Sequence, residues 1–122
     1  MPSFFSTKKI TVPVGITDLM NSVLCRTDLL EEVNLPDSLT LIGDSAFFGC
    51  KSLRHITLPS TLTEIGVSAF NSCRLLEEIE IPESVASVGS KSFFDCERLE
   101  RAVLPSGLTV IADSLFSGCA AL

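Results

Sequence analysis

Hydrophobic and polar residues follow a pattern that repeats every 23 residues along most of the chain. One proline column runs through Pro13, Pro36, Pro59, Pro82 and Pro105. Three more columns keep the same spacing: Phe47, Phe70, Phe93 and Phe116; Cys50, Cys73, Cys96 and Cys119; and Leu30, Leu53, Leu76, Leu99 and Leu122. A unit this short cannot bury its apolar side chains alone, so we expect successive coils to stack and join these positions into continuous core columns.

Each coil predicts three short local structures. The pattern L-x-x-I-x-L, as in residues 53–58, alternates apolar and polar positions as a strand does, and Pro59 ends it because proline has no N–H for a ladder. Residues 62–66 form a second short extended piece that closes at a glycine. Residues 68–73 predict one or two helical turns, which only stacking could hold, since an isolated helix needs about 12–15 residues.

The glycine that closes the second piece recurs as Gly43, Gly66 and Gly89, which predicts a turn with positive φ. Met20 and Ala112 occupy the matching positions in the first and last coils. Our preferred interpretation is that these end coils bend differently. The alternative is that the turn does not require glycine.

The repeats make residues 1–122 a single repeat domain of about five coils. Residues 30–122 are regular, whereas 8–29 form a degenerate first coil: Leu24 replaces the phenylalanine, Thr27 replaces the cysteine, and Cys25 comes two residues early. The chain ends at Leu122, the first residue of a new strand, without a capping segment. An uncapped coil exposes a strand edge and apolar columns. We therefore expect either a fragment of a longer protein or end-to-end stacking with a partner through the last coil.

Composition and charge narrow the function classes. The chain is 46% hydrophobic and 20% charged, as folded proteins are. We expect no membrane insertion, because no apolar run approaches the ~20 residues of a spanning helix, and the first residues lack the pattern of a signal peptide. The net charge of −6 and the absence of a Lys/Arg cluster argue against a nucleic-acid partner, which would need a basic patch.

Five cysteines are the main candidates for chemistry. We interpret the four in-register thiols as buried free thiols that act as small hydrophobic residues. A metal site is disfavoured because ligands must converge from several directions, whereas these thiols lie along a line. A disulfide between adjacent coils is an alternative that requires a specific torsion. Cys25 is the least predictable of the five.

No catalytic sequence accompanies the only histidine, His55, and the chain has no phosphate-binding glycine loop. We interpret His55 as a bystander on an open face. The sequence therefore predicts no enzyme, no catalytic residue, no cofactor and no metal ion.

The L-x-x-I-x-L-P strand, the L-T-x-I-G turn and the A-F-x-x-C segment resemble the BspA-like leucine-rich repeat family, clearly over residues 30–122 and more weakly over 8–29. The resemblance implies an α/β fold, a right-handed solenoid with a concave parallel sheet and short helical turns. It also implies an adhesin-like protein of the cell surface or a secreted one, which binds a host or partner protein. Because no signal peptide is visible, a cytoplasmic scaffold without an adhesive role is the alternative.

Leucine-rich repeats usually meet their partners at the outward positions of the strand. These positions form three columns here: Glu31, Arg54, Glu77 and Glu100; Glu32, His55, Glu78 and Arg101; and Thr11, Asn34, Thr57, Glu80 and Val103. Six glutamates against two arginines give these columns a net charge of −4, out of −6 for the chain. We weigh two readings: a solvated charge ladder, and a docking face for a basic protein partner.

Two aromatic residues are candidate surface anchors. Phe48 and Phe94 occupy a column that continues with Asn71 and Ser117, and such variation is typical of a surface position. Exposed aromatic side chains can anchor a protein interface.

Overall fold

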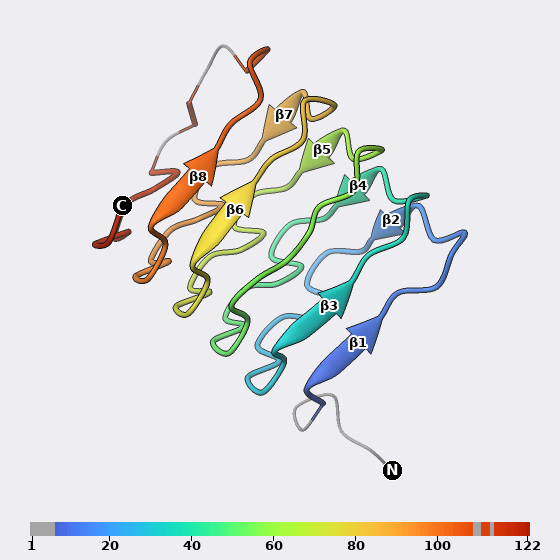
Figure 1. Ribbon diagram of the computed structural model, residues 1–122, viewed down its shortest axis with the longest axis horizontal. Helices are drawn as coiled ribbons and strands as arrows, with labels where there is room; N and C mark the ends of the chain where they lie inside the picture. Colours follow the sequence, from blue (N-terminus) through green and yellow to red (C-terminus); the bar gives the residue numbers. More distant parts are fainter. Residues whose placement is uncertain (1–6, 109–110, 113) are drawn as a thin grey trace.

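The chain winds into a stack of coils with two rows of short parallel strands (Figure 1). The computed structural model describes residues 7–108, 111–112 and 114–122. We number the coils by the sequence repeat: coil 1 is 8–29, coil 2 is 30–52, coil 3 is 53–75, coil 4 is 76–98 and coil 5 is 99–121. The expected count of about five coils, the right-handed winding and the concave sheet stay predictions.

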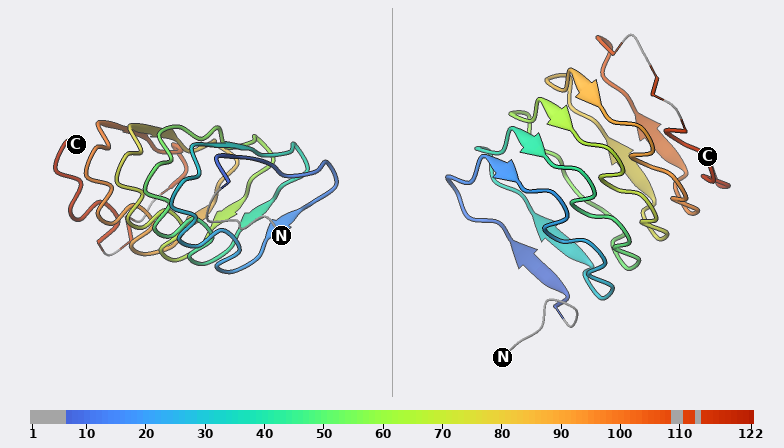
Figure 2. Two further views of the ribbon diagram at one scale, coloured as in Figure 1. Left: turned by 90° about the horizontal axis from the view of Figure 1, so that it is seen from below. Right: turned by 180° about the vertical axis from the view of Figure 1, so that it is seen from behind.

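The front row in Figure 1 contains the L-x-x-I-x-L strands: β1 (Lys9–Thr11), β3 (Glu32–Asn34), β6 (Glu78–Glu80) and β8 (Arg101–Val103). The second row, best seen from behind in Figure 2, contains β2 (Asp18–Leu19), β4 (Leu41–Ile42), β5 (Glu64–Ile65) and β7 (Ser87–Val88). The second row is one continuous sheet in the order β2-β4-β5-β7, whereas the front row divides into the pairs β1-β3 and β6-β8. All the strand pairs are parallel, and in each pair a residue lies opposite the residue 23 positions ahead, as Leu41 does opposite Glu64.

The apolar positions form the core that the repeat predicts. The phenylalanine rings of coils 2 to 5 stack with centroids 5.1, 5.5 and 5.8 Å apart and nearly parallel planes. Phe47, Phe70 and Phe93 are fully buried. In coil 1, Leu24 takes the ring's place and is also buried. The predicted alignment of the phenylalanine column is confirmed.

The segment before each L-x-x-I-x-L strand is a run of turns, and the expected helical turns are not confirmed, because the described residues contain no helix. Its N–H groups alternate in direction. Phe48 donates back to Ser45 O at 3.1 Å within its own coil, whereas Phe47 donates to Ala69 O of the next coil at 2.8 Å. Positive φ at Ser45 (56°) and Gly49 (73°) breaks any helical run. A helix would direct all its N–H groups along its own axis, so it would lose these bonds between coils.

The prediction of positive φ at Gly43, Gly66 and Gly89 is wrong, because positive-φ glycines among the described residues lie elsewhere. Close approach explains these glycines instead. A Cβ on Gly66 would lie 2.7 Å from Asp44 N and 2.8 Å from Gly43 C, both backbone atoms of the preceding coil. Met20 has no described coil on its N-terminal side, and its side chain is 74% exposed. The coil-to-coil distance, rather than the turn conformation, requires glycine.

We predict that Gly66→Ala lowers the free energy of unfolding by about 1–3 kcal/mol, because backbone atoms of coil 2 must move to admit the methyl group. Gly107→Ala is the matched control, since a Cβ there meets nothing within 4 Å. Urea titration followed by circular dichroism measures both variants. Equal stability of the two would contradict the close-approach explanation.

We also predict that Phe70→Ala costs about 3–5 kcal/mol, because it leaves a cavity between two stacked rings. Phe94→Ala removes a half-buried ring at the variable position and should cost less than half as much. The urea midpoints of the two variants, each compared with the wild-type chain, test this difference.

Candidate protein-binding face

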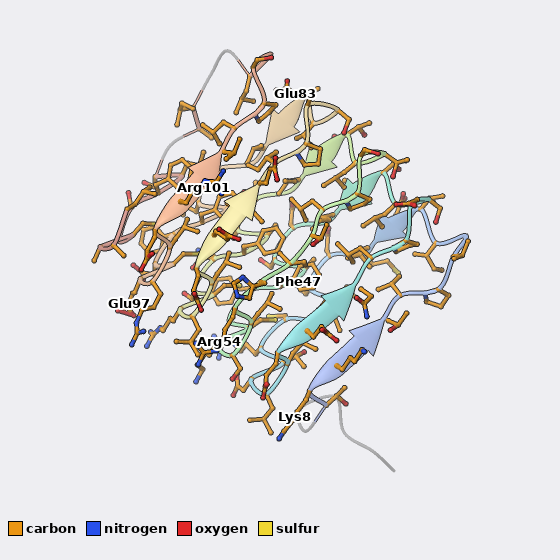
Figure 3. The ribbon with its side chains drawn as sticks, in the orientation of Figure 1. Lys8, Phe47, Arg54, Glu83, Glu97 and Arg101 are labelled. Atoms are coloured by element: carbon orange, nitrogen blue, oxygen red, sulfur yellow. The ribbon has the colours of Figure 1, made fainter. Side chains whose placement is uncertain are left out.

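The front row holds the predicted face residues in the predicted columns. In β1, β3 and β6 the outer two residues are exposed, and the middle one is buried or partly buried. In β8, Arg101 is exposed, whereas Ala102 and Val103 are half-buried. The register pairs Glu78 with Arg101 and Glu80 with Val103, as the 23-residue offset requires. Figure 3 shows the side chains on this front row, with Lys8, Arg54 and Arg101 labelled. We call this surface, formed by the three outward columns, the strand face.

Two lysines that the sequence columns omitted belong to the strand face. Lys9 pairs with Glu32 in the strand register, and the two side chains form an ion pair with Nζ 3.1 Å from Oε2. Lys8, one residue earlier, precedes Glu31 in the same way. With both lysines included, the face carries a net charge of −2 rather than −4. The repeat spacing itself could have revealed them.

Ion pairs between neighbouring coils run along the face. Arg54 Nη1 lies 3.4 Å from Glu77 Oε2, and Arg101 Nη1 lies 3.7 Å from Glu78 Oε2. All of these side chains are largely exposed, so each pair contributes only about 0–1 kcal/mol. Among the described face residues, three glutamates have no ion pair: Glu31, Glu80 and Glu100. The charge ladder therefore exists, and it leaves a few acids free.

The front row is interrupted at coil 3. Residues 53–58 match the strand pattern but form no strand, contrary to the prediction. Within the described chain, the N–H groups of residues 55–58 donate no backbone hydrogen bond. Only the first bond to coil 4 survives, from Glu77 N–H to Arg54 O at 3.0 Å. The apolar positions of residues 53–58 match those of the neighbouring coils, so the hydrophobic pattern does not indicate this gap.

A depression of about 320 Å³ lies on the strand face beside the gap. Six residues of the predicted face line it: His55, Thr57, Glu78, Glu80, Arg101 and Val103. The side chains of Ile56 and Leu58 point into the core and are only 8% and 7% exposed. The structure thus gathers half of the predicted face residues around one hollow, while Glu31, Glu32, Asn34, Arg54, Glu77 and Glu100 lie outside it.

The two aromatic candidates lie on the turn segments, apart from the strand face. Phe48 is half-buried in a second depression of about 330 Å³, and the Arg26 guanidinium lies 5.8 Å from the centre of its ring. Phe94 is also half-buried, with Lys91 Nζ 5.8 Å from its ring centre. These cations cover the rings in part. Phe48 and Phe94 therefore do not extend the strand face.

The in-register cysteines are buried, as predicted. Each thiol donates a hydrogen bond to a carbonyl of the preceding coil, for example Cys73 Sγ to Phe47 O at 3.2 Å. Burial raises the pKa of Cys50 from 9.0 to about 12, and burial raises the pKa of Cys73 well above its ordinary value. Cys25 stands outside this column and is half-exposed. Among the described residues, no group of three or more His, Cys, Asp or Glu side chains could hold a metal ion.

Comparison with known proteins gives one family and several solved structures. A family model described as the BspA type leucine rich repeat region matches residues 3–122 in six copies. A leucine-rich repeat protein from Bacteroides ovatus ATCC 8483 is 38% identical with a TM-score of 0.91, and the match covers 94% of this chain and 30% of that one. No protein of curated function matches the sequence.

Two more solved structures are similar. A leucine rich cell surface protein from Faecalibacterium prausnitzii A2-165 is 35% identical with a TM-score of 0.90, over 95% of this chain and 31% of that one. A leucine-rich repeat protein from T. pallidum is 29% identical with a TM-score of 0.85, over 94% and 67%. This chain therefore spans less than a third of the length of two of these relatives. Within the described residues, no helix is long and apolar enough to cross a membrane.

We predict that the buried thiols lower the free energy of unfolding as the pH rises into the alkaline range. An unfolded thiol ionises near pH 9, whereas folded Cys50 keeps its proton up to about pH 12, so its stabilising effect is complete below pH 9 and is lost as the pH rises toward 12. Each such thiol adds a slope of up to about 1.4 kcal/mol per pH unit. Cys50→Ala should therefore show a shallower decline between pH 9 and 11 in urea titrations. Thr27→Ala, which removes a buried hydroxyl at the matching position of coil 1, is the control and should keep the wild-type slope.

Proposed function

Because this chain belongs to the BspA-type leucine-rich repeat family, we propose that it binds a partner protein through its strand face. The observation that carries the proposal is the array of outward side chains that stacking holds in fixed columns. Proteins of this repeat class are generally protein-interaction modules, and an extended array of charged and polar groups suits recognition of another protein.

We propose an adhesin-like role at the cell surface or after secretion, with a host or neighbouring-cell protein as the partner. This part of the proposal is supported by the relative from Faecalibacterium prausnitzii, which is described as a cell surface protein and is 35% identical. The alternative is an intracellular scaffold, which the buried, free thiols favour because thiols persist in reducing compartments. Thiol titration of protein taken directly from its native cells separates the two: oxidised cysteines support export, and reduced ones support the scaffold.

We propose that acidic side chains of the strand face, which has a small negative net charge, contact the partner. Glu31, Glu80 and Glu100 are the glutamates of the strand face that form no ion pair with any residue the structure describes. With a net charge of −2, the face selects a partner with local basic side chains rather than a strongly basic protein. We propose no nucleic-acid partner and no membrane insertion. End-to-end stacking through coil 5 stays a prediction.

We propose no catalytic role. The solenoid of this family is a repeat scaffold without catalytic machinery. His55 lies exposed on the strand face, where it lines the shallow depression beside Glu78 and Glu80. Its place there is consistent with a contact residue.

We predict that the combined substitutions Glu77→Lys, Glu78→Lys and Glu80→Lys weaken partner binding at least tenfold without unfolding the chain, because they reverse charge on exposed or half-exposed positions. The test measures affinity by biolayer interferometry for partners recovered from a displayed proteome library. Asp18→Lys, Asp37→Lys and Glu64→Lys together make the matched control, since they change the net charge equally at exposed positions away from the strand face. If both triple variants bind as the wild type does, the contact lies on another surface.

A further inference from the structure

The gap at coil 3 leaves backbone groups of two neighbouring coils without partners. Val12 N–H donates to Asn34 O across β1-β3 at 2.9 Å, and Ile81 N–H donates to Val103 O across β6-β8 at 2.9 Å. The equivalent bond across coils 3 and 4 would join Leu58 N–H to Glu80 O, and it is missing. The backbone of coil 3 therefore presents donors, and that of coil 4 presents acceptors, along the depression that residues of both coils line.

The gap does not admit another strand between the coils. The Phe70 and Phe93 rings of coils 3 and 4 remain stacked at 5.5 Å, and β5 remains paired with both β4 and β7. Leu53 and Leu76 stay fully buried beneath the gap. A ligand must therefore lie on the strand face, over the gap, and reach the open backbone groups from outside.

The lining of the depression selects the charge of that ligand. Glu78 is already paired with Arg101 at 3.7 Å, whereas Glu80 has no ion pair among the described residues and adjoins its own open carbonyl. A carboxylate and a carbonyl side by side accept several hydrogen bonds and offer one negative charge. An arginine guanidinium fits this arrangement because it presents five donors in a planar fork, whereas a lysine ammonium presents three donors from a single point.

We propose that this depression is a subsite for an arginine side chain of the partner protein, carried on an extended segment that lies over the gap. The guanidinium bonds to the Glu80 carboxylate and the Glu80 carbonyl, and a peptide carbonyl of the same segment accepts from Leu58 N–H. This inference rests on the proposed function of the strand face, and it names the residue of the partner that the face recognises.

The direct test is an NMR titration of the whole chain with acetyl-Gly-Ser-Arg-Ser-Gly-amide. We expect the peptide to shift the amide resonances of residues 56–58 and 78–80. The same peptide with citrulline, which keeps the shape of arginine but has no charge, should bind at least tenfold more weakly, and the lysine peptide should bind severalfold more weakly. Equal binding of the arginine and citrulline peptides, or shifts confined to another surface, would overturn the subsite.

Variants of the chain provide the second arm. Glu80→Gln keeps the size of the side chain and should weaken the arginine peptide about tenfold, whereas Glu31→Gln, another unpaired glutamate of the face outside the depression, should leave it within about twofold. Thr57→Trp should block the depression sterically. If Glu80→Gln and Thr57→Trp both bind the peptide as the wild type does, the inference is wrong.

The same variants separate this inference from the proposed function. If the partner protein loses affinity for the charge-reversed face but not for Glu80→Gln or Thr57→Trp, the strand face binds and the arginine subsite is refuted. If the peptide binds at the depression while the charge-reversed chain keeps its partner, the depression binds arginine, but the proposed contact face and the use of the subsite by the partner are both refuted.

Discussion

Hydrogen bonds from one turn segment to the next fix the distance between coils, and the other features follow from that distance. Leu24 donates to Ala46 O at 2.9 Å, Phe47 to Ala69 O at 2.8 Å, and Phe70 to Ser92 O at 2.8 Å. At this separation the phenylalanine rings can only stack face to face. The same separation excludes a Cβ at the glycine of coils 2 to 4. It also places each of the four in-register thiols against a carbonyl of the preceding coil.

The turn segments and the second row of strands hold neighbouring coils together by hydrogen bonds. The coils therefore stay stacked even where the front row does not pair. The second row is continuous from β2 to β7, yet the front row opens at coil 3 without disturbing the core. Backbone groups that fail to pair when buried cost about 1–3 kcal/mol each. At the strand face water can meet them, so the cost falls. Because the second row of strands alone keeps the coils stacked, backbone groups of the front row can stay unpaired and remain available to hydrogen-bond a ligand.

The repeat spacing was enough to predict the stacking of the coils, the core columns and most outward positions of the strand face, since each of these depends only on which side chain lies above which. Lys8 and Lys9 follow the same spacing but were left out of the predicted columns. The repeat spacing did not predict that the segment before each strand lacks helical turns. It also did not predict that the recurring glycine is required by the close approach of the preceding coil. Positive φ at Ser45 and Ser68, where glycine would be expected, follows from the bonds to the next coil. The gap at coil 3 was not predictable from the hydrophobic pattern, because residues 53–58 keep the apolar positions of the strand.

The cysteine column shows how coil 1 can depart from the pattern and still pack. Cys50 donates from its thiol to Leu24 O in coil 1. Thr27, which replaces cysteine in coil 1, donates instead to Leu24 O of its own coil at 2.8 Å, and it is only 2% exposed. A hydroxyl is more costly to bury than a thiol unless it finds an acceptor, and the nearby carbonyl provides one. The position of the cysteine column therefore requires a small side chain that can donate a hydrogen bond to a nearby carbonyl. Threonine donates within its own coil, whereas cysteine donates to the preceding coil.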